Sequence, residues 1–441
     1  MYTQNTPAKY LLRRIVCFAL AAAMLFGGAV LFRSCGKEPE PQQELDIWGT
    51  GAQDAPDTPP AGAPQPLAYS ELYSAMWLSY LEWESMDFSS ESAFTQEAAA
   101  IMANCVNLGL DTVLDTVLVQ VRPFGDALYK SSIFPQSHLM TGVQGGDAGF
   151  DPLAVLVNAA HAAGLRIEAW INPYRIRLNA EKPAALSADN PAVQWMNDPL
   201  TADRVHEVGA GLYYDPGYPE VRALIAEGVR EIVENYPVDG VLFDDYFYPT
   251  TDAAFDANAY AIYGEGAALS VWRRENVNML VRDIYALIKQ LRPECTFGIS
   301  PSGNIRNNLE QQYSDIYLWL SEPGYVDYLM PQIYWGFDYA LSNGNTAFAF
   351  ENCLNDWLSL PRAASVSLYV ALGAYRIGEG DGCEATLAEW NSGENLARQI
   401  DALRSGAQGF SLYRYDFLYK NTAHEALVTK ELAAVQALLA S

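Results

Sequence analysis

The sequence predicts a closed (β/α)8 barrel, a TIM barrel, over residues 69–441. Short apolar runs rich in β-branched and aromatic residues alternate there with longer stretches in which apolar residues recur every three or four positions. The apolar runs are continuous, which is typical of strands buried on both faces of a parallel sheet. About eight such strand and helix units follow one another, and that number fits a closed barrel.

Each expected strand is an apolar run bounded by turn formers or polar clusters. The runs are AMWLSYL near Met76, TVLVQV ending at Val121, RIEAWINP near Trp170, DGVLFDDYF after Val238, TFGISP ending at Pro301, VDYLMPQIYW near Met330, LYVALGAYR near Leu372 and GFSLYRY near Leu412. The expected helices between them are Thr95 to Leu108, Pro152 to Ala163, Pro219 to Asn235, Ser270 to Leu291 and Glu394 to Arg404.

The N-terminus predicts a membrane anchor. Residues 15–32 form an uninterrupted apolar run, close to the roughly 20 residues that span a bilayer, and three basic residues precede it. We therefore expect residues 1–35 to hold a cytoplasmic start and a transmembrane signal-anchor helix, and we favour an anchor over a cleaved secretion signal. Residues 36–68, rich in Pro, Glu and Gln, are expected to be a disordered linker that leaves the barrel outside the cytoplasm.

Composition excludes several classes of protein. The 441 residues include 27 basic and 53 acidic side chains, so the net charge of −26 repels nucleic acid. Six cysteines occur without C-x-x-C spacing, and four histidines occur without an H-x-x-x-H pair. We expect neither a metal site nor a cofactor.

Polar and aromatic side chains follow the expected strands. On a barrel the C-terminal strand ends form the active site, and carboxylates with aromatic rings in one cleft suit sugars, whose C–H faces stack on rings. We expect Asp244 and Asp245 to be catalytic. The substrate-binding candidates are Arg122, Trp170, Asn172, Tyr174, Arg175, Tyr246, Gln332, Tyr334, Trp335, Tyr375 and Arg376. Ordinary barrel packing is the alternative for any single aromatic residue among them.

A set of motifs in a fixed order carries a family resemblance. The segments VQVRPFGDALYKSSIFP, AWINPYRI, YYDPGYPEVR, VDGVLFDDYFYP, GISPSGNIRN, VDYLMPQIYW and GAYRIG resemble the glycosyl hydrolase-like 10 family. The resemblance covers about Tyr73 to Phe417. It implies a TIM barrel and glycoside hydrolase activity on a polysaccharide, with cell-wall glycan stripped of its peptides as one suggested substrate.

Glycoside hydrolysis usually needs two carboxyl groups, one to protonate the leaving oxygen and one to act as nucleophile or base. Neighbours on a strand face opposite sides, so Asp244 and Asp245 cannot both serve if the strand stays regular. The resemblance favours Asp244 as the reacting group, with Asp245 orienting a neighbour, for example an arginine or a helix N-terminus. Asp126 is the first choice for the second acid. The weaker choices are Asp338, Asp416, Glu310 and Glu322.

The arginines leave two interpretations open. Arg122, Arg175 and Arg376 could hold a substrate carboxylate, such as the lactyl group of a muramic sugar, or could lock loops through salt bridges. Function has alternatives too. The chain could be a non-catalytic glycan-binding barrel that keeps the aromatic cleft, or a membrane-tethered scaffold.

Overall fold

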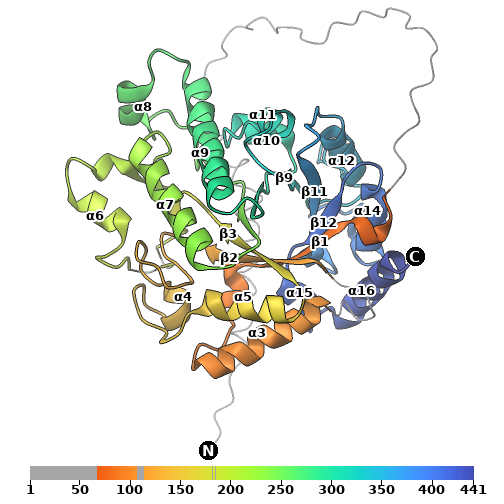
Figure 1. Ribbon diagram of the computed structural model, residues 1–441. Helices are drawn as coiled ribbons and strands as arrows, with labels where there is room; N and C mark the ends of the chain where they lie inside the picture. Colours follow the sequence, from red (N-terminus) through yellow and green to blue (C-terminus); the bar gives the residue numbers. More distant parts are fainter. Residues whose placement is uncertain (1–66, 107–113, 181, 184) are drawn as a thin grey trace, which may run out of the picture. The chain divides into compact units, whose positions relative to one another are not determined.

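The barrel predicted from the sequence is present in a computed structural model that describes residues 67–106, 114–180, 182–183 and 185–441 (Figure 1). Eight parallel strand positions close into a ring, since β1 pairs with β12 and β9 pairs with both β8 and β11. The strands are β1 Tyr73–Leu78, β2 Thr116–Arg122, β3 Arg166–Ile171, β7 Gly240–Phe243, β8 Thr296–Ile299, β9 Tyr328–Leu329, β10 Gln332–Ile333, β11 Ser367–Leu372 and β12 Gly409–Leu412.

The sixth strand position is divided in two. β9 and β10 flank Met330 and Pro331, and both halves pair with β11. Proline has no N–H to give to a neighbouring strand, which accounts for the break. All eight predicted strands are therefore confirmed, with this one interrupted.

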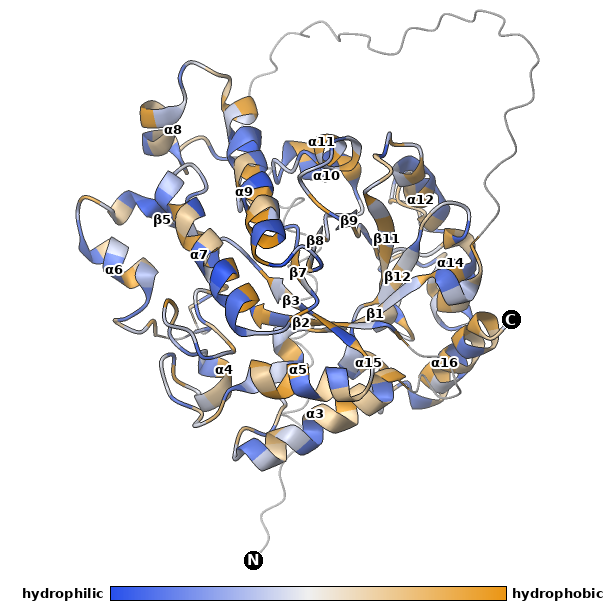
Figure 2. Ribbon diagram, in the orientation of Figure 1, coloured by the Kyte–Doolittle hydropathy of each residue, from blue (hydrophilic) through white to orange (hydrophobic). Residues whose placement is uncertain are grey.

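The outer helices surround the sheet (Figure 1). Each presents an apolar stripe to the strands and a polar face outward, so hydrophobic and hydrophilic colours alternate along the helices in Figure 2. Helix α5 shows how the sequence starts such an element, because the Asp151 side chain accepts from Ala154 N at 3.3 Å and Pro152 occupies the first turn. The helices are α3 Glu91–Val106, α5 Pro152–Ala162, α7 Pro219–Asn235, α9 Leu269–Leu291, α11 Ile316–Ser321, α12 Phe350–Leu358, α14 Asn395–Leu403 and α16 Glu425–Leu439.

The interior of the barrel is filled by its own cluster of side chains, separate from the larger core between strands and helices. A polar path crosses this interior: Trp77 Nε1 donates to Ser411 Oγ at 2.7 Å, and Ser411 Oγ donates to the Met330 sulfur at 3.0 Å. The apolar members are Ala75, Trp77, Leu118, Trp170, Leu242, Tyr328, Met330 and Ala371.

A buried acid, Glu168 of β3, also lies inside the barrel. It accepts hydrogen bonds from the Tyr328 hydroxyl at 2.5 Å and from Thr296 Oγ1 at 3.1 Å. Burial raises the pKa of Glu168 to about 7, although these two bonds and the nearby Arg166 act in the opposite direction. This carboxyl group is absent from the sequence-based candidates.

A small antiparallel sheet interrupts the third strand–helix unit, and the sequence analysis does not anticipate it. Its strands are β4 Arg175–Arg177, β5 Val205–Val208 and β6 Gly211–Tyr214, in the order β4-β6-β5. Helix α6, Pro191–Asn197, precedes β5. The insert positions Arg175 above the barrel, because β4 begins four residues after β3 ends.

The predicted anchor and linker lie outside the described residues, except for the last two linker positions, 67 and 68. In the part of the chain that the structure describes, no helix is both long and apolar enough to cross a membrane.

Candidate active site

Asp244 follows β7 directly, and its carboxyl group lies at the C-terminal mouth of the barrel. One carboxyl oxygen, Oδ2, accepts from Trp170 Nε1 at 3.1 Å and from Asn172 Nδ2 at 3.3 Å. The other oxygen, Oδ1, is buried and has no partner among the described residues. Asp244 is only 2% exposed. Burial raises its pKa to about 7; the charge of Arg175 opposes this rise, and the charge of Asp245 adds to it.

Asp245 points toward the other side of the same mouth. It accepts from Gln312 Nε2 at 3.0 Å and from Gln332 Nε2 at 3.3 Å. Burial raises its pKa, while the two amide donors lower it. Its described hydrogen-bond partners are thus two glutamine amides, while the expected role of Asp245 in orienting a neighbour stays a prediction. Because the regular strand ends at Phe243, both carboxyl groups reach the mouth on diverging sides.

Arg175 and Tyr246 complete the rim beside the acids. Arg175 Nε donates to the Pro123 carbonyl at 3.1 Å, and its guanidinium lies 5.5 Å from the Tyr246 ring. The Arg175 amide donates to Asn172 Oδ1 at 3.1 Å, so Asn172 links the rim to Asp244. Tyr246 is 39% exposed, which makes it the most accessible ring next to the two acids among the described candidates.

Three tyrosines form a wall on the opposite side of the mouth. The rings of Tyr334 and Tyr413 lie 5.7 Å apart and nearly parallel, and Tyr375 meets both edge-on at 5.7 and 5.8 Å. Burial raises the pKa of Tyr334 well above its ordinary value, and the charge of Asp245 contributes. These rings therefore stand close to the acids and offer apolar faces to a sugar.

Three predicted site residues contact other parts of the protein and not the two acids: Arg122, Tyr174 and Trp335. The Arg122 guanidinium packs 4.0 Å from the Phe134 ring, and a side chain at Gly228 of α7 would meet it at 2.6 Å. A β-bulge between Gln120 and Arg122 explains this, because an extra residue turns Arg122 away from the barrel interior.

Tyr174 and Trp335 are packing residues in this structure. Tyr174 is fully buried, with its ring 6.3 Å from Phe247. Trp335 stacks on Phe348 at 5.1 Å and is only partly exposed.

Asp126, the predicted second acid, is fully buried in the loop after β2. Its Oδ2 accepts from Gln144 Nε2 at 2.9 Å and pairs with His138 Nδ1 at 3.1 Å. None of the described contacts joins Asp126 to Asp244. Burial and these partners argue against direct contact with a sugar, so a catalytic role for Asp126 stays a prediction without geometric support.

The weaker candidates for the second acid are also placed. Glu310 pairs with Arg306 at 2.8 Å on the surface of the short helix α10, Ile305–Glu310, and Asp416 pairs with Lys420 at 3.4 Å. Asp338 and Glu322 are exposed. Asp245 is thus the buried carboxyl group that the structure brings nearest to Asp244 in these contacts.

Two site residues escape the sequence analysis. Gln312 comes from the loop between α10 and α11, and no pattern in the sequence connects it with Asp245. Tyr413 could have been found, because period-two alternation from Ser411 of β12 places it toward the interior.

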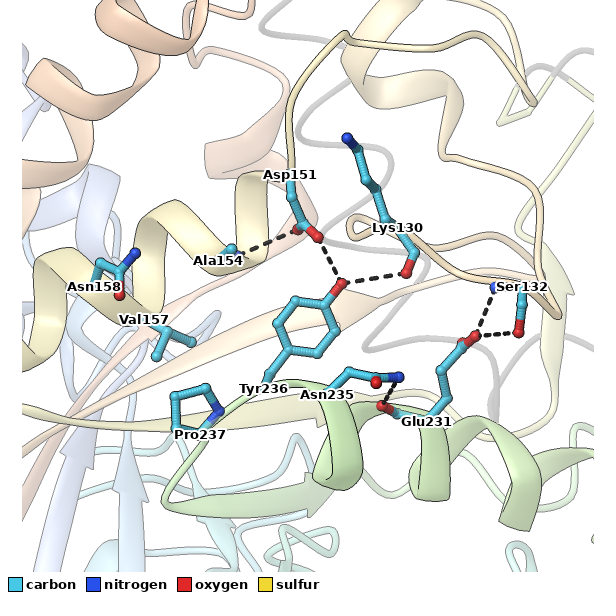
Figure 3. A pocket seen from close by; sticks show the side chains of 10 residues that line it. All are labelled: Lys130, Ser132, Asp151, Ala154, Val157, Asn158, Glu231, Asn235, Tyr236 and Pro237. Atoms are coloured by element: carbon cyan, nitrogen blue, oxygen red, sulfur yellow. Dashed lines mark hydrogen bonds between the residues drawn. The ribbon is translucent and has the colours of Figure 1, made fainter.

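A separate hollow of about 480 Å³ lies on the outer side of the barrel, between α5 and α7 (Figure 3). Its acids are already occupied: Asp151 accepts from the Tyr236 hydroxyl at 2.7 Å, and Glu231 accepts from Ser132 N at 2.6 Å and Ser132 Oγ at 2.7 Å. The strand ends therefore carry the candidate active site. Across the described residues, no group of three or more His, Cys, Asp or Glu side chains is arranged to hold a metal ion.

The fold and the site define a class: a (β/α)8 barrel whose mouth holds two neighbouring buried carboxyl groups beside aromatic rings, as glycoside hydrolases of this fold do. Residues 75–389 match the model of the family described as Glycosyl hydrolase-like 10. The chain belongs to this family.

Relatives agree with this assignment. The chain is 35% identical over 366 residues to glycosyl hydrolase YngK of Bacillus subtilis (strain 168), covering 77% of this chain and 68% of that protein. It is 31% identical over 404 residues to glycosyl hydrolase DigH of Escherichia coli (strain K12), covering 84% and 90%.

Among solved structures, the PgaB (BpsB) glycoside hydrolase domain from Bordetella bronchiseptica matches with a TM-score of 0.51 and 13% identity, covering 81% of this chain and 98% of that one. At this identity the likeness shows the shared fold alone.

Proposed function

We propose that this protein is a glycoside hydrolase that cleaves a polysaccharide at the mouth of the barrel. The observation that carries the proposal is Asp244. Its carboxyl group is buried at a strand end, two N–H donors hold one oxygen, and its pKa is raised to about 7. A carboxyl group poised near neutral pH is suited to glycosidic chemistry.

Asp244 is the reacting group in this proposal. Trp170 and Asn172 stabilise its ionised form, which attacks the anomeric carbon as nucleophile or takes a proton from the attacking water as base. The leaving oxygen takes its proton from a second carboxyl group, for which we propose Asp245, whose pKa is also raised by burial. Asp245, held by Gln312 and Gln332, orients the substrate or a water molecule beside it. Tyr246 and the wall of Tyr334, Tyr375 and Tyr413 hold the sugar rings by stacking.

The substrate proposed is a cell-wall glycan without its peptides. This rests on the resemblance to the family and on the arginines at the mouth. The protein is proposed to act outside the cytoplasm, tethered by its N-terminal segment.

The experiment compares the full chain with Asp244→Asn and Asp245→Asn on peptide-free and intact cell-wall glycans, with products analysed by mass spectrometry. Asp244→Asn is expected to lower kcat by about three orders of magnitude or more with nearly unchanged glycan affinity, as for a group that acts in the transition state. Asp245→Asn is expected to lose less rate and more stability, because its amide partners are left underpaired.

The alternative is a non-catalytic glycan-binding barrel. It predicts glycan binding by the wild-type chain without any product, and equal affinity in both variants. Near-normal turnover in both variants would remove these acids from the chemistry.

A further inference from the structure

The backbone of Tyr313 is held in a conformation that non-glycine residues rarely adopt. Its φ of 56° lies in the left-handed region, where a side chain is sterically disfavoured. Tyr313 lies in the loop between α10 and α11 and is only 6% exposed. Glu265, the other described non-glycine residue with positive φ, is exposed in a turn after α8, Ala257–Tyr263. A residue that is both strained and buried must be held by its surroundings.

Arg273 of α9 holds the Tyr313 side chain. Its Nη1 donates to the Tyr313 hydroxyl at 2.9 Å, and its guanidinium lies 5.1 Å from the Tyr313 ring. The same guanidinium is fixed from its other side, because Nε and Nη2 donate to the two Asp256 oxygens at 2.8 and 2.6 Å. Both members of this ion pair are buried, and a bidentate pair has a specific geometry. Helix α9 therefore fixes the place of the Tyr313 ring.

The residue before Tyr313 is Gln312, one of the two amides that bind Asp245. Gln312 Nε2 donates to Asp245 Oδ2 at 3.0 Å. Arg273 also contacts the segment that carries the acid, since its guanidinium lies 5.2 Å from the ring of Tyr248, three residues after Asp245. The rings of Tyr248 and Tyr313 meet edge-on at 5.1 Å. One buried arginine thus contacts both chain segments that meet at the hydrogen bond between Gln312 and Asp245.

Two other buried arginines make no such link. Arg376 donates to the Gly380 carbonyl of its own loop at 3.2 Å, and its guanidinium packs 4.6 Å from the Tyr375 ring. Arg122 packs behind β2 against α7. Arg273 differs from both because its contacts lead to one of the two acids at the mouth.

We propose that the contact between Arg273 and Tyr313 positions Gln312, and through it Asp245, for proton transfer to the leaving oxygen. The proposal rests on the proposed hydrolysis, in which Asp245 is the acid, and adds the residues that orient this acid. Asp245 gives its proton to the glycosidic oxygen as the bond to the anomeric carbon breaks, so its hydroxyl group must face that oxygen. Amide donors on both carboxyl oxygens, from Gln312 and Gln332, fix the plane of the group. Arg273 and Tyr313 are positioning residues, because they act through Gln312.

The test compares two substrates that differ in the leaving group. A peptide-free cell-wall oligosaccharide loses a sugar alkoxide, which needs a proton from the acid, whereas its dinitrophenyl glycoside releases a stable phenolate without one. Tyr313→Phe removes the hydroxyl that Arg273 binds and keeps the ring. It should lower kcat/KM for the oligosaccharide roughly 3- to 10-fold, the size of one lost hydrogen bond, and leave kcat/KM for the dinitrophenyl glycoside nearly unchanged. Arg273 itself is kept, because loss of its pair with Asp256 would strongly destabilise the fold.

Gln312→Ala should show the same difference between the two substrates, since it removes the donor to Asp245 directly. Adding Tyr313→Phe to Gln312→Ala should cause no further loss on the oligosaccharide, because both changes act through one contact. A further loss of the same size as in the single variant would show that Tyr313 does not act through Gln312, and the proposal would be wrong.

Tyr236→Phe is the matched control. Tyr236 is also buried, and its hydroxyl donates to Asp151 at 2.7 Å in the hollow between α5 and α7. This change should lower thermal stability, as Tyr313→Phe does, with an unchanged ratio of the two rates. Equal losses on the two substrates in Tyr313→Phe would show that Tyr313 only supports the fold, and would overturn the proposal.

Titration of Asp245 separates this proposal from the proposed hydrolysis. Burial raises the pKa of Asp245 and the Gln312 amide lowers it, so loss of this hydrogen bond should raise the pKa further. Carbon NMR of the labelled Asp245 carboxyl group in the full chain measures this pKa in Tyr313→Phe, Gln312→Ala and Tyr236→Phe. A rise in the first two and not in the third supports the positioning role even if no glycan is cleaved. An unchanged pKa in Tyr313→Phe overturns it even if hydrolysis is found.

Discussion

The pKa of Asp244 is shifted in opposite directions by burial and by the charge of Arg175, and the net shift can be measured. Burial raises its pKa to about 7, and the charge of Arg175 lowers it. If the ionised form reacts, kcat/KM should rise with pH through about 7. Arg175→Gln removes the opposing charge, so the rise should move to higher pH. Arg177→Gln, on the same short strand, is the control and should leave the pH midpoint of kcat/KM unchanged. If kcat/KM instead falls as pH rises through 7, the protonated form of Asp244 reacts, and Asp244 is the general acid.

Tyr246 is the ring best placed to stack on a sugar. It is 39% exposed and lies beside the acids, whereas Trp335 is packed on Phe348. Tyr246→Ala should weaken glycan binding by about 1 to 2 kcal/mol in titration calorimetry, as for other aromatic anchors. Tyr263→Ala, a similarly exposed tyrosine on α8 (Ala257–Tyr263), should have no effect. Equal effects of both changes would count against stacking at Tyr246.

Glu168 couples the barrel interior to pH. Folding raises its pKa from the ordinary 4.5 to about 7, so the folded state holds this proton more tightly than the unfolded state. Its contribution to stability is complete below about 4.5 and is lost as pH rises through about 7. As pH rises from 5 to 8, the wild type should lose this contribution and Glu168→Gln should not. The free energy of unfolding of the variant should therefore rise relative to that of the wild type by on the order of 2 to 3 kcal/mol. If the difference in free energy of unfolding between Glu168→Gln and the wild type were the same at pH 5 and pH 8, this prediction would be wrong.

At the scale of elements, helix α7 depends on a glycine. A Cβ at Gly228 would lie 2.6 Å from Arg122 Nη1 and 2.8 Å from the Phe134 ring. Alanine is the better helix former by about 1 kcal/mol, but both neighbours are buried and cannot move aside. Gly228→Ala should therefore lower the free energy of unfolding by about 1 to 3 kcal/mol. Ala223 is exposed on the same helix, so Ala223→Gly should lower the free energy of unfolding by only about 1 kcal/mol. If Gly228→Ala were more stable than the wild type, the Arg122 side chain would have to move aside, and the prediction would be wrong.

The sequence predicts the elements of the barrel better than its insert. Buried parallel strands leave continuous apolar runs, so all eight positions are recognisable. The strands of the insert read RIR, VHEV and GLYY, which are too short and mixed to form a pattern. Asp244, Asn172 and Gln332 are predictable because they follow strands, whereas Gln312 comes from a distant loop and the bulge that redirects Arg122 has no sequence signal.

At the scale of the whole molecule, the predicted anchor gives a test of location. An apolar run at residues 15–32 behind a basic start should hold the protein in the membrane with residues 69–441 outside. Protease added to intact cells should degrade the barrel, and the full chain should sediment with membranes. Recovery of intact protein in the cytosol would contradict this location, and a shortened form in the medium would favour a cleaved signal.

Ring closure has a consequence for the order of folding. The first strand, β1, is completed on one side by β12, through pairs such as Tyr73 with Gly409. The chain is synthesised from its N-terminus, so β1 cannot pair with β12 until the other strands of the barrel have been made. Contacts this distant along the chain form slowly, because the intervening loop must close first. A sheet in which β1 and β12 are not yet paired has two free strand edges, and such edges promote aggregation.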